Sequence, residues 1–149
     1  MPGPAVGRSN ASEHAPGLAR RLAAMAYDFL LASAVLFLAG LPVAVIADGN
    51  LAGMGRLVYQ GYLFFVLGLY FNYCWHRGGQ TLGMKTWKLR VVRFDGAQVS
   101  RRRAALRYLL AWPSIGFAGA GIVWTLFDRD GQYLHDRLAG TRISRSDAM

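Results

Sequence analysis

Hydrophobic residues in this chain are gathered into three long runs without a charged residue. The first run covers Phe29 to Ala47 and the second covers Leu57 to Trp75, each 19 residues long, and the third covers the 20 residues from Tyr108 to Phe127. A helix rises about 1.5 Å per residue and a bilayer core is about 30 Å thick, so roughly 20 apolar residues span it. The pattern therefore predicts an all-α membrane protein with about three transmembrane helices. We expect the spans over residues 22–47, 56–75 and 108–127.

Two of these runs admit a second interpretation. Arg20 and Arg21 precede the first run as the basic residues of a signal peptide would, but the run exceeds the usual hydrophobic region and Asp28 interrupts its start. We therefore expect a retained span. The third run contains Pro113 and several glycines, so we expect it to be broken or re-entrant, a backbone form that a membrane tolerates only where protein shields it.

The segments outside the runs are polar. Residues 1–16 mix Pro, Gly, Ser and Asn without periodicity, which is typical of a flexible tail. We expect a membrane domain over residues 17–143, with residues 144–149 as a C-terminal tail and residues 76–107 as a loop between the second and third spans.

A small β-hairpin is expected inside this loop. Leu89 to Phe94 is rich in β-prone residues, Asp95-Gly96 is a hairpin turn signal, and Ala97 to Ser100 would form the return strand. Gly140 to Ile143 also looks like a short strand. A two-stranded hairpin is marginal in water, so we expect this third strand to pair with it.

Composition and charge support the membrane assignment. The 149 residues are 54% hydrophobic, yet Lys and Arg number 17 against 8 Asp and Glu, a net charge of +9. This hydrophobic content excludes disorder for most of the chain, and a single cysteine excludes a disulfide framework or a cysteine-rich metal site within one chain. Nine of the 17 basic residues fall in the loop 76–107. The positive-inside rule then predicts that the N-terminus and this loop are cytoplasmic.

The side of the C-terminus depends on the third run. Three full crossings would place the C-terminus outside, but the C-terminal segment carries four arginines and its strand is expected to meet the cytoplasmic hairpin. We favour a cytoplasmic C-terminus.

The basic residues indicate lipid rather than nucleic acid as the partner. They flank the apolar runs, where anionic headgroups are the nearest acidic surface. We expect Arg101, Arg102 and Arg103 to contact headgroups.

Asp28 is the clearest candidate for a functional side chain. A carboxylate near a helix centre costs about 2.5–3.5 kcal/mol on insertion scales, so Asp28 should face protein or water. Arg21 lies about 10.5 Å away along the helix axis, too far for a direct ion pair, so the partner of Asp28 should come from another segment. A packing lock between helices and an ion or proton pathway are equal alternatives for its role.

Polar residues also gather just after the third run. His135-Asp136 could suggest acid–base catalysis, but adjacent side chains rarely point the same way and no nucleophile stands beside them. We expect a structural role in which Asp136 pairs with Arg20 or Arg21. The three histidines lack metal-ligand spacing, so we expect no metal, no cofactor and no enzymatic activity.

Three sequence blocks resemble the RDD family of bacterial membrane proteins, which is named for one arginine and two aspartates. The blocks are Arg21-Leu-Ala-Ala-Met-Ala-Tyr-Asp28, the stretch from Gly79 to Val92, and Leu134-His-Asp136-Arg-Leu-Ala-Gly-Thr141. The resemblance implies that Arg21, Asp28 and Asp136 are the named residues, with Arg20 and Asp130 as alternatives and His135 as a further candidate. This chain departs from the family at Lys88, where a glycine or a shorter side chain is usual.

The resemblance implies a multi-pass protein of the bacterial inner membrane whose molecular function is undefined. Transport of an ion or small solute is one hypothesis, and it needs a homo-oligomer because three spans are too few to enclose a path. The spacing Gly116-x-x-x-Ala120 could let helices of such an oligomer approach closely. The alternative is a non-transporting scaffold or assembly partner in which the Arg/Asp set is a structural lock.

Overall fold

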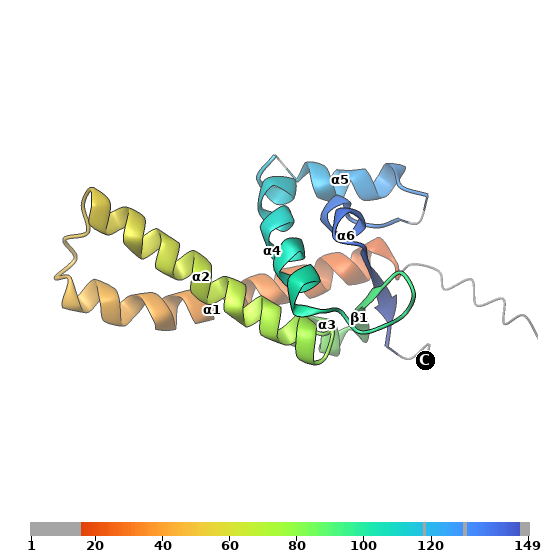
Figure 1. Ribbon diagram of the computed structural model, residues 1–149, viewed down its shortest axis with the longest axis horizontal. Coiled ribbons are helices and arrows are strands. Elements are labelled where there is room, and N and C mark those ends of the chain that lie inside the picture. The colour runs from red at the N-terminus through yellow and green to blue at the C-terminus, as the bar shows by residue number, and fades with distance from the viewer. Residues whose placement is uncertain (1–15, 118, 130, 147–149) are drawn as a thin grey trace, which may run out of the picture.

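Two long helices, α1 (Leu18–Ile46) and α2 (Met54–Arg77), pack along each other and project from the rest of the molecule (Figure 1). This computed structural model describes residues 16–117, 119–129 and 131–146. The predicted tail therefore lies almost entirely outside the described residues. A short turn through Asp48 and Gly49, both with positive φ, reverses the chain between the two helices.

The remaining elements gather around the beginning of α1 and the end of α2. The short helix α3 packs on α1, α4 packs on α2, and both α5 and α6 pack on α4. Their bounds are α3 (Leu82–Thr86), β1 (Leu89–Arg93), α4 (Arg101–Gly116), α5 (Ala120–Phe127), α6 (Leu134–Leu138) and β2 (Thr141–Arg145).

The sheet has two antiparallel strands, β1 and β2, with Val91 opposite Ile143. The prediction that the C-terminal strand pairs with Leu89–Phe94 is confirmed, and β2 extends to Arg145, within the segment assigned to the C-terminal tail. The predicted local hairpin is wrong, because Ala97 to Ser100 forms no strand.

Hydrogen bonds explain why the expected return strand does not form. The Gln98 side chain donates to the main-chain carbonyls of His76 and Arg77 at the end of α2, at 2.6 and 3.2 Å. Ser100 becomes the N-cap of α4, and its hydroxyl oxygen accepts from the N–H of Arg103. The segment is therefore committed to connecting two helices, and α4 begins inside the predicted loop.

The structure has one helix long and apolar enough to cross a membrane, α1, among the residues it describes. A second candidate arises if α4 and α5, which meet at 93°, count as one broken span. The expected break in the third run is thus present. Helix α2 has 24 residues, but its tyrosines and polar side chains such as Gln60 and Asn72 make it less apolar than α1. The number of crossings stays a prediction.

The break also separates two residues expected to share a helix face. Gly116 is the last residue of α4 and Ala120 is the first of α5. A Gly-x-x-x-Ala face needs a continuous helix, because only there do residues four apart lie one above the other. The expected close-approach motif is therefore absent at this position.

The hydrophobic core joins α1, α2, α3 and α4 to the sheet and to Tyr133. Leu89, Val91, Val99 and Ala104 have at most 1% of their surface exposed. By contrast, large apolar side chains along the projecting helices are exposed, including Phe29 at 72%. Because soluble proteins seldom expose such extensive apolar surface, this distribution fits a protein whose projecting helices contact lipid or other membrane-embedded protein.

Candidate functional site

Asp28 is buried and bound by the segment that follows α2. Its Oδ2 accepts a hydrogen bond from the Thr81 hydroxyl, and its Oδ1 accepts one from the main-chain N–H of Gly83 at 3.0 Å. Thr81 is also the N-cap of α3, where its oxygen accepts from the N–H of Met84 at 3.3 Å. The expectation that the partner of Asp28 comes from another segment is confirmed.

A glycine makes this close approach possible. A Cβ atom on Gly83 would lie 2.6 Å from the carbonyl oxygen of Ala24 and 2.7 Å from Oδ1 of Asp28. Any side chain would therefore push α3 away from α1 and break the contact between the Gly83 N–H and the carboxylate. The Asp28 contact thus depends on the residue type at position 83.

Asp136 forms a buried ion pair with Arg107, not with Arg20 or Arg21. Nη1 of Arg107 lies 2.9 Å from Oδ1 of Asp136, and the two side chains are only 4% and 1% exposed. The predicted partner is wrong because the sequence pattern places Arg107 in a polar loop, whereas it lies on the buried face of α4 with Ala104 and Tyr108. Removing one member of such a pair leaves an uncompensated buried charge, which costs about 3–5 kcal/mol.

Arg21 lies in the same cluster but is held by an aromatic ring. Its guanidinium carbon is 4.9 Å from the centre of the Tyr133 ring, and the Arg107 guanidinium similarly covers Trp75 at 4.6 Å. Both distances fit cation–π contacts. Arg20 is only half-buried. Of the two candidate arginines, Arg21 is therefore the one that lies inside the molecule.

We call Arg21, Asp28, Arg107 and Asp136 the charged cluster. It contains two cationic and two anionic side chains, and all four are buried. Such a balanced set avoids the large cost of burying net charge away from water. Arg107 and Thr81 are the members of this arrangement that were not expected from the sequence.

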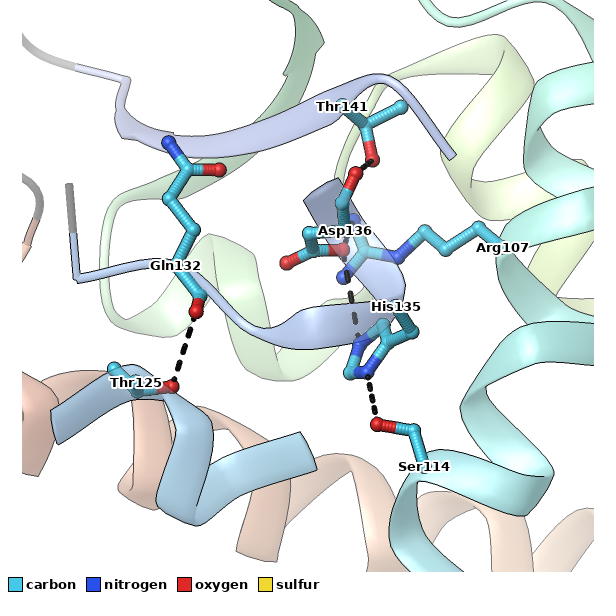
Figure 2. A network of polar contacts seen from close by, with 7 residues as sticks. All are labelled: Arg107, Ser114, Thr125, Gln132, His135, Asp136 and Thr141. Atoms are coloured by element: carbon cyan, nitrogen blue, oxygen red, sulfur yellow. Dashed lines mark hydrogen bonds and ion pairs between the residues drawn. The ribbon is translucent and has the colours of Figure 1, made fainter. Parts of the chain in front are cut away.

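His135 lies beside the cluster, facing both Ser114 and Asp136 (Figure 2). Its Nδ1 is 3.4 Å from the Ser114 hydroxyl, and its Nε2 is 3.7 Å from Oδ1 of Asp136. The expectation that the adjacent side chains of His135 and Asp136 point apart is therefore wrong. The short helix α6 brings them together on its buried side.

Burial lowers the pKa of the His135 imidazole, and the Asp136 carboxylate offsets only part of this effect. The ring is therefore neutral at pH 7 and carries one proton. Because a carboxylate can only accept, the geometry favours the proton on Nε2 and leaves Nδ1 to accept from Ser114. This arrangement orients the imidazole ring between Ser114 and Asp136.

Two further contacts attach the C-terminal segment around the cluster, as Figure 2 shows. The Thr125 hydroxyl donates to the carbonyl of Gln132 at 3.4 Å, and the Thr141 hydroxyl donates to the carbonyl of Asp136 at 3.3 Å. These contacts tie α5, α6 and the start of β2 together. They hold Asp136 in place for Arg107.

A second acidic residue in this segment, Asp128, has a role that the sequence does not reveal. Its Oδ1 binds the Arg137 guanidinium, and its Oδ2 accepts from the N–H of Gln132 at 3.0 Å. Asp128 therefore closes the turn between α5 and α6. Asp130, the alternative second aspartate, lies outside the described residues.

The three expected headgroup-contacting arginines differ in their surroundings. Arg101 and Arg102 are exposed on the first turn of α4. Arg103 instead donates to the carbonyls of Ala139 and Gly140, at 3.4 and 3.2 Å. Its cation thus binds the C-terminal end of α6, where the helix dipole favours positive charge.

Over the part of the chain that the structure describes, no group of three or more His, Cys, Asp or Glu side chains is arranged to hold a metal ion. Cys74 is a free, half-buried thiol.

A family model described as the RDD family matches residues 15–140. The chain belongs to the RDD family. RDD proteins are membrane proteins, which agrees with the apolar helix α1 and with the exposed apolar side chains. No curated protein and no solved structure matches the chain.

The RDD assignment gives the charged cluster its context. Arg21, Asp28 and Asp136, the residues that the sequence resemblance selects, are all buried members of it. Lys88, where the family usually has glycine or a shorter side chain, has a φ of 53°. Glycine adopts this left-handed conformation without steric cost, so a glycine at this position would have a direct structural reason.

Proposed function

We propose that this RDD protein is a non-transporting membrane scaffold or assembly partner in which the charged cluster is a structural lock. The observation that carries the proposal is the position of Asp28. Both of its carboxylate oxygens accept hydrogen bonds from the same chain, one from Thr81 and one from Gly83. A carboxylate that binds a transported ion must release its ligands in each cycle, whereas these contacts join α1 to α3.

The second pair acts in the same way between other elements. Arg107 comes from α4 and Asp136 from α6, so their ion pair joins the helix that contains the first half of the broken third run to the C-terminal segment. A buried ion pair contributes more to the choice of one arrangement than to net stability in some proteins. We infer that the cluster specifies how the elements after α2 dock on the α1–α2 pair.

The exposed apolar faces of α1 and α2 are the surfaces left for partners within the membrane. They include Phe37 at 65% exposure and Leu38 at 71% on α1, with Phe65 at 63% on α2. We infer that they contact lipid, another copy of the chain or a partner membrane protein. The distribution of Lys and Arg supports a multi-pass orientation in the bacterial inner membrane with the N-terminus and residues 76–107 cytoplasmic.

Transport by a homo-oligomer is the second candidate, and a specific observation favours it. Nε of Arg21, the Tyr133 hydroxyl oxygen and Oε1 of Gln132 are among the buried polar atoms that have no hydrogen-bond partner within the described residues. Buried polar atoms of this kind commonly bind water or an ion. Broken helices such as α4–α5 also surround the substrate sites of many transporters.

An isosteric substitution at Thr81 separates the two functions. Thr81→Val removes the hydroxyl that donates to Asp28, and Thr81→Ser is the matched control because it keeps that hydroxyl. If the charged cluster is a structural lock, Thr81→Val and Asp28→Asn should each lower the free energy of unfolding of the detergent-purified protein by about 1–3 kcal/mol. Proteoliposomes of the wild type should show no more proton, Na⁺ or K⁺ flux than protein-free vesicles.

Two results would contradict the scaffold proposal. One is wild-type flux above the protein-free background that Asp28→Asn abolishes while thermal stability is unchanged. The other is a Thr81→Val protein as stable as the Thr81→Ser protein, since the hydroxyl would then contribute nothing to the fold. The first of these results would establish transport.

A further inference from the structure

A groove lies between the last turns of α2 and the first turns of α4, away from the charged cluster. Its volume is about 860 Å³, within the range of ligand-binding clefts. Leu69, Tyr73 and Ala105 supply apolar surface to it, and Arg77, Arg101 and Arg102 supply guanidinium groups.

Hydrogen bonds hold the two walls of the groove together. The Asn72 amide on α2 donates to the carbonyl of Arg101 at 3.0 Å. The Gln98 amide binds the last carbonyls of α2, and the His76 ring lies 3.3 Å from the carbonyl of Val99 through Nδ1. Because both walls are fixed to the same connecting segment, the backbone positions that carry the arginines are set before any ligand binds.

The groove carries positive charge that the described part of the chain does not neutralise. No Asp or Glu is among its lining residues. Arg77 binds the hydroxyl of Tyr73 at 3.2 Å and covers its ring, and neither Arg101 nor Arg102 forms an ion pair with a described residue. Three arginines therefore line one opening, and a guanidinium group can bind a phosphate through paired N–H donors.

The apolar wall decides which anion fits. Leu69 and Tyr73 are 55% and 60% exposed and lie on the same helix as the second apolar run, so the groove continues into the apolar surface of α2. A free phosphate would leave this wall in water. A phospholipid would place its phosphate on the arginines and the start of an acyl chain along Leu69 and Tyr73.

We propose that this groove is a binding site for the headgroup of an anionic phospholipid. This site differs from the headgroup contact expected for residues 101–103. Arg101 and Arg102 take part and Arg77 joins them. Arg103 does not take part, because it caps α6. This proposal is independent of the choice between scaffold and transporter, since it concerns a separate surface.

Lipid titration of the full-length protein tests the site. Native mass spectrometry of the detergent-purified protein would measure the lipid-bound fraction with dioctanoyl phosphatidylglycerol, and with dioctanoyl phosphatidylcholine as the probe that has the same chains without net charge. The double variant R101Q/R102Q is compared with R56Q/R129Q, which removes two exposed arginines outside the groove. Circular dichroism without lipid checks that both variants remain folded.

The expected result is tighter binding of phosphatidylglycerol than of phosphatidylcholine, weakened about thirtyfold in R101Q/R102Q and less than about threefold in R56Q/R129Q. Equal binding of the two lipids would overturn the proposal, as would an equal loss in both variants, which would indicate net charge alone. Displacement of phosphatidylglycerol by equimolar inorganic phosphate would also overturn it, because the site would then bind the free anion. Failure of the scaffold proposal would leave all these outcomes unaffected.

Discussion

Single residues in the charged cluster differ in how much of their role the sequence reveals. Asp28 is conspicuous because a carboxylate interrupts the start of an apolar run, and its need for a partner follows from the cost of burial. The identity of that partner does not follow, since Thr81 lies 53 positions away in the chain. Thr81 also precedes a short helix, and an N-cap threonine has a local explanation that conceals its second contact.

The ion pair between Arg107 and Asp136 gives a prediction at this scale. Both single variants, Arg107→Met and Asp136→Asn, leave one buried charge alone, so each should lower the free energy of unfolding by about 3–5 kcal/mol. The double variant should cost clearly less than the sum of the two, because it leaves neither charge. Thermal or denaturant unfolding of the four purified proteins measures this coupling.

Additive losses in the double variant would show that the two side chains do not interact. The exposed salt bridge between Arg93 and Asp95, at 2.9 Å, provides a matched control. Its members have 39% and 54% of their side-chain surface exposed, so the corresponding cycle should give about 0–1 kcal/mol.

At the scale of elements, the sequence predicts where a helix or strand forms or breaks better than it predicts which segments contact each other. The break in the third run follows from Pro113 and the glycines after it, and the strand Leu89–Arg93 follows from its β-prone residues. The prediction of a return strand is wrong. A turn signal and four suitable residues cannot show that Gln98 and Ser100 have contacts with helices instead. Arg107 was missed for the related reason that α4 begins earlier than its apolar residues do.

The approach of α3 to α1 gives a prediction for Gly83→Ala. A β-carbon there would lie within 2.7 Å of atoms of Ala24 and Asp28, so the variant should lose about 1–3 kcal/mol of stability despite the better helix propensity of alanine. Gly61→Ala is the control, because a β-carbon at this position in α2 would meet no neighbouring atom within 4 Å. Thermal unfolding in detergent compares the two, and a Gly83→Ala protein as stable as Gly61→Ala would contradict the contact.

For the whole molecule, the two strands give the strongest constraint on topology. β1 follows α3 and β2 follows α6, and their residues pair from Leu89 with Arg145 to Arg93 with Thr141. Strands that pair with each other lie on the same side of a membrane, and an open two-stranded sheet lies outside the lipid core because its outer edges are unpaired. The loop after α2 and the C-terminal segment should therefore share one side, which the charge distribution predicts to be the cytoplasm.

Reporter fusions test this arrangement. A reporter that is active only in the cytoplasm should be active when fused at the C-terminus, and one that is active only outside should be inactive there. The same reporters placed after Gly49, in the turn between α1 and α2, should give the opposite result. A C-terminal fusion and a Gly49 fusion that are both active only outside would separate β1 from β2 and contradict the sheet.

The ion pair between Arg107 and Asp136 has a consequence for the order in which the chain folds while it is being synthesised. Chains are made from the N-terminus at about 5–20 residues per second, so Arg107 leaves the ribosome before Asp136, and α4 exists before its counter-charge does. Until α6 has been made, docking α4 on α2 would bury an arginine without its anion. We therefore expect the nascent protein to keep α4 partly solvated while α1 and α2 associate, and the region around the cluster to close when α6 has been made.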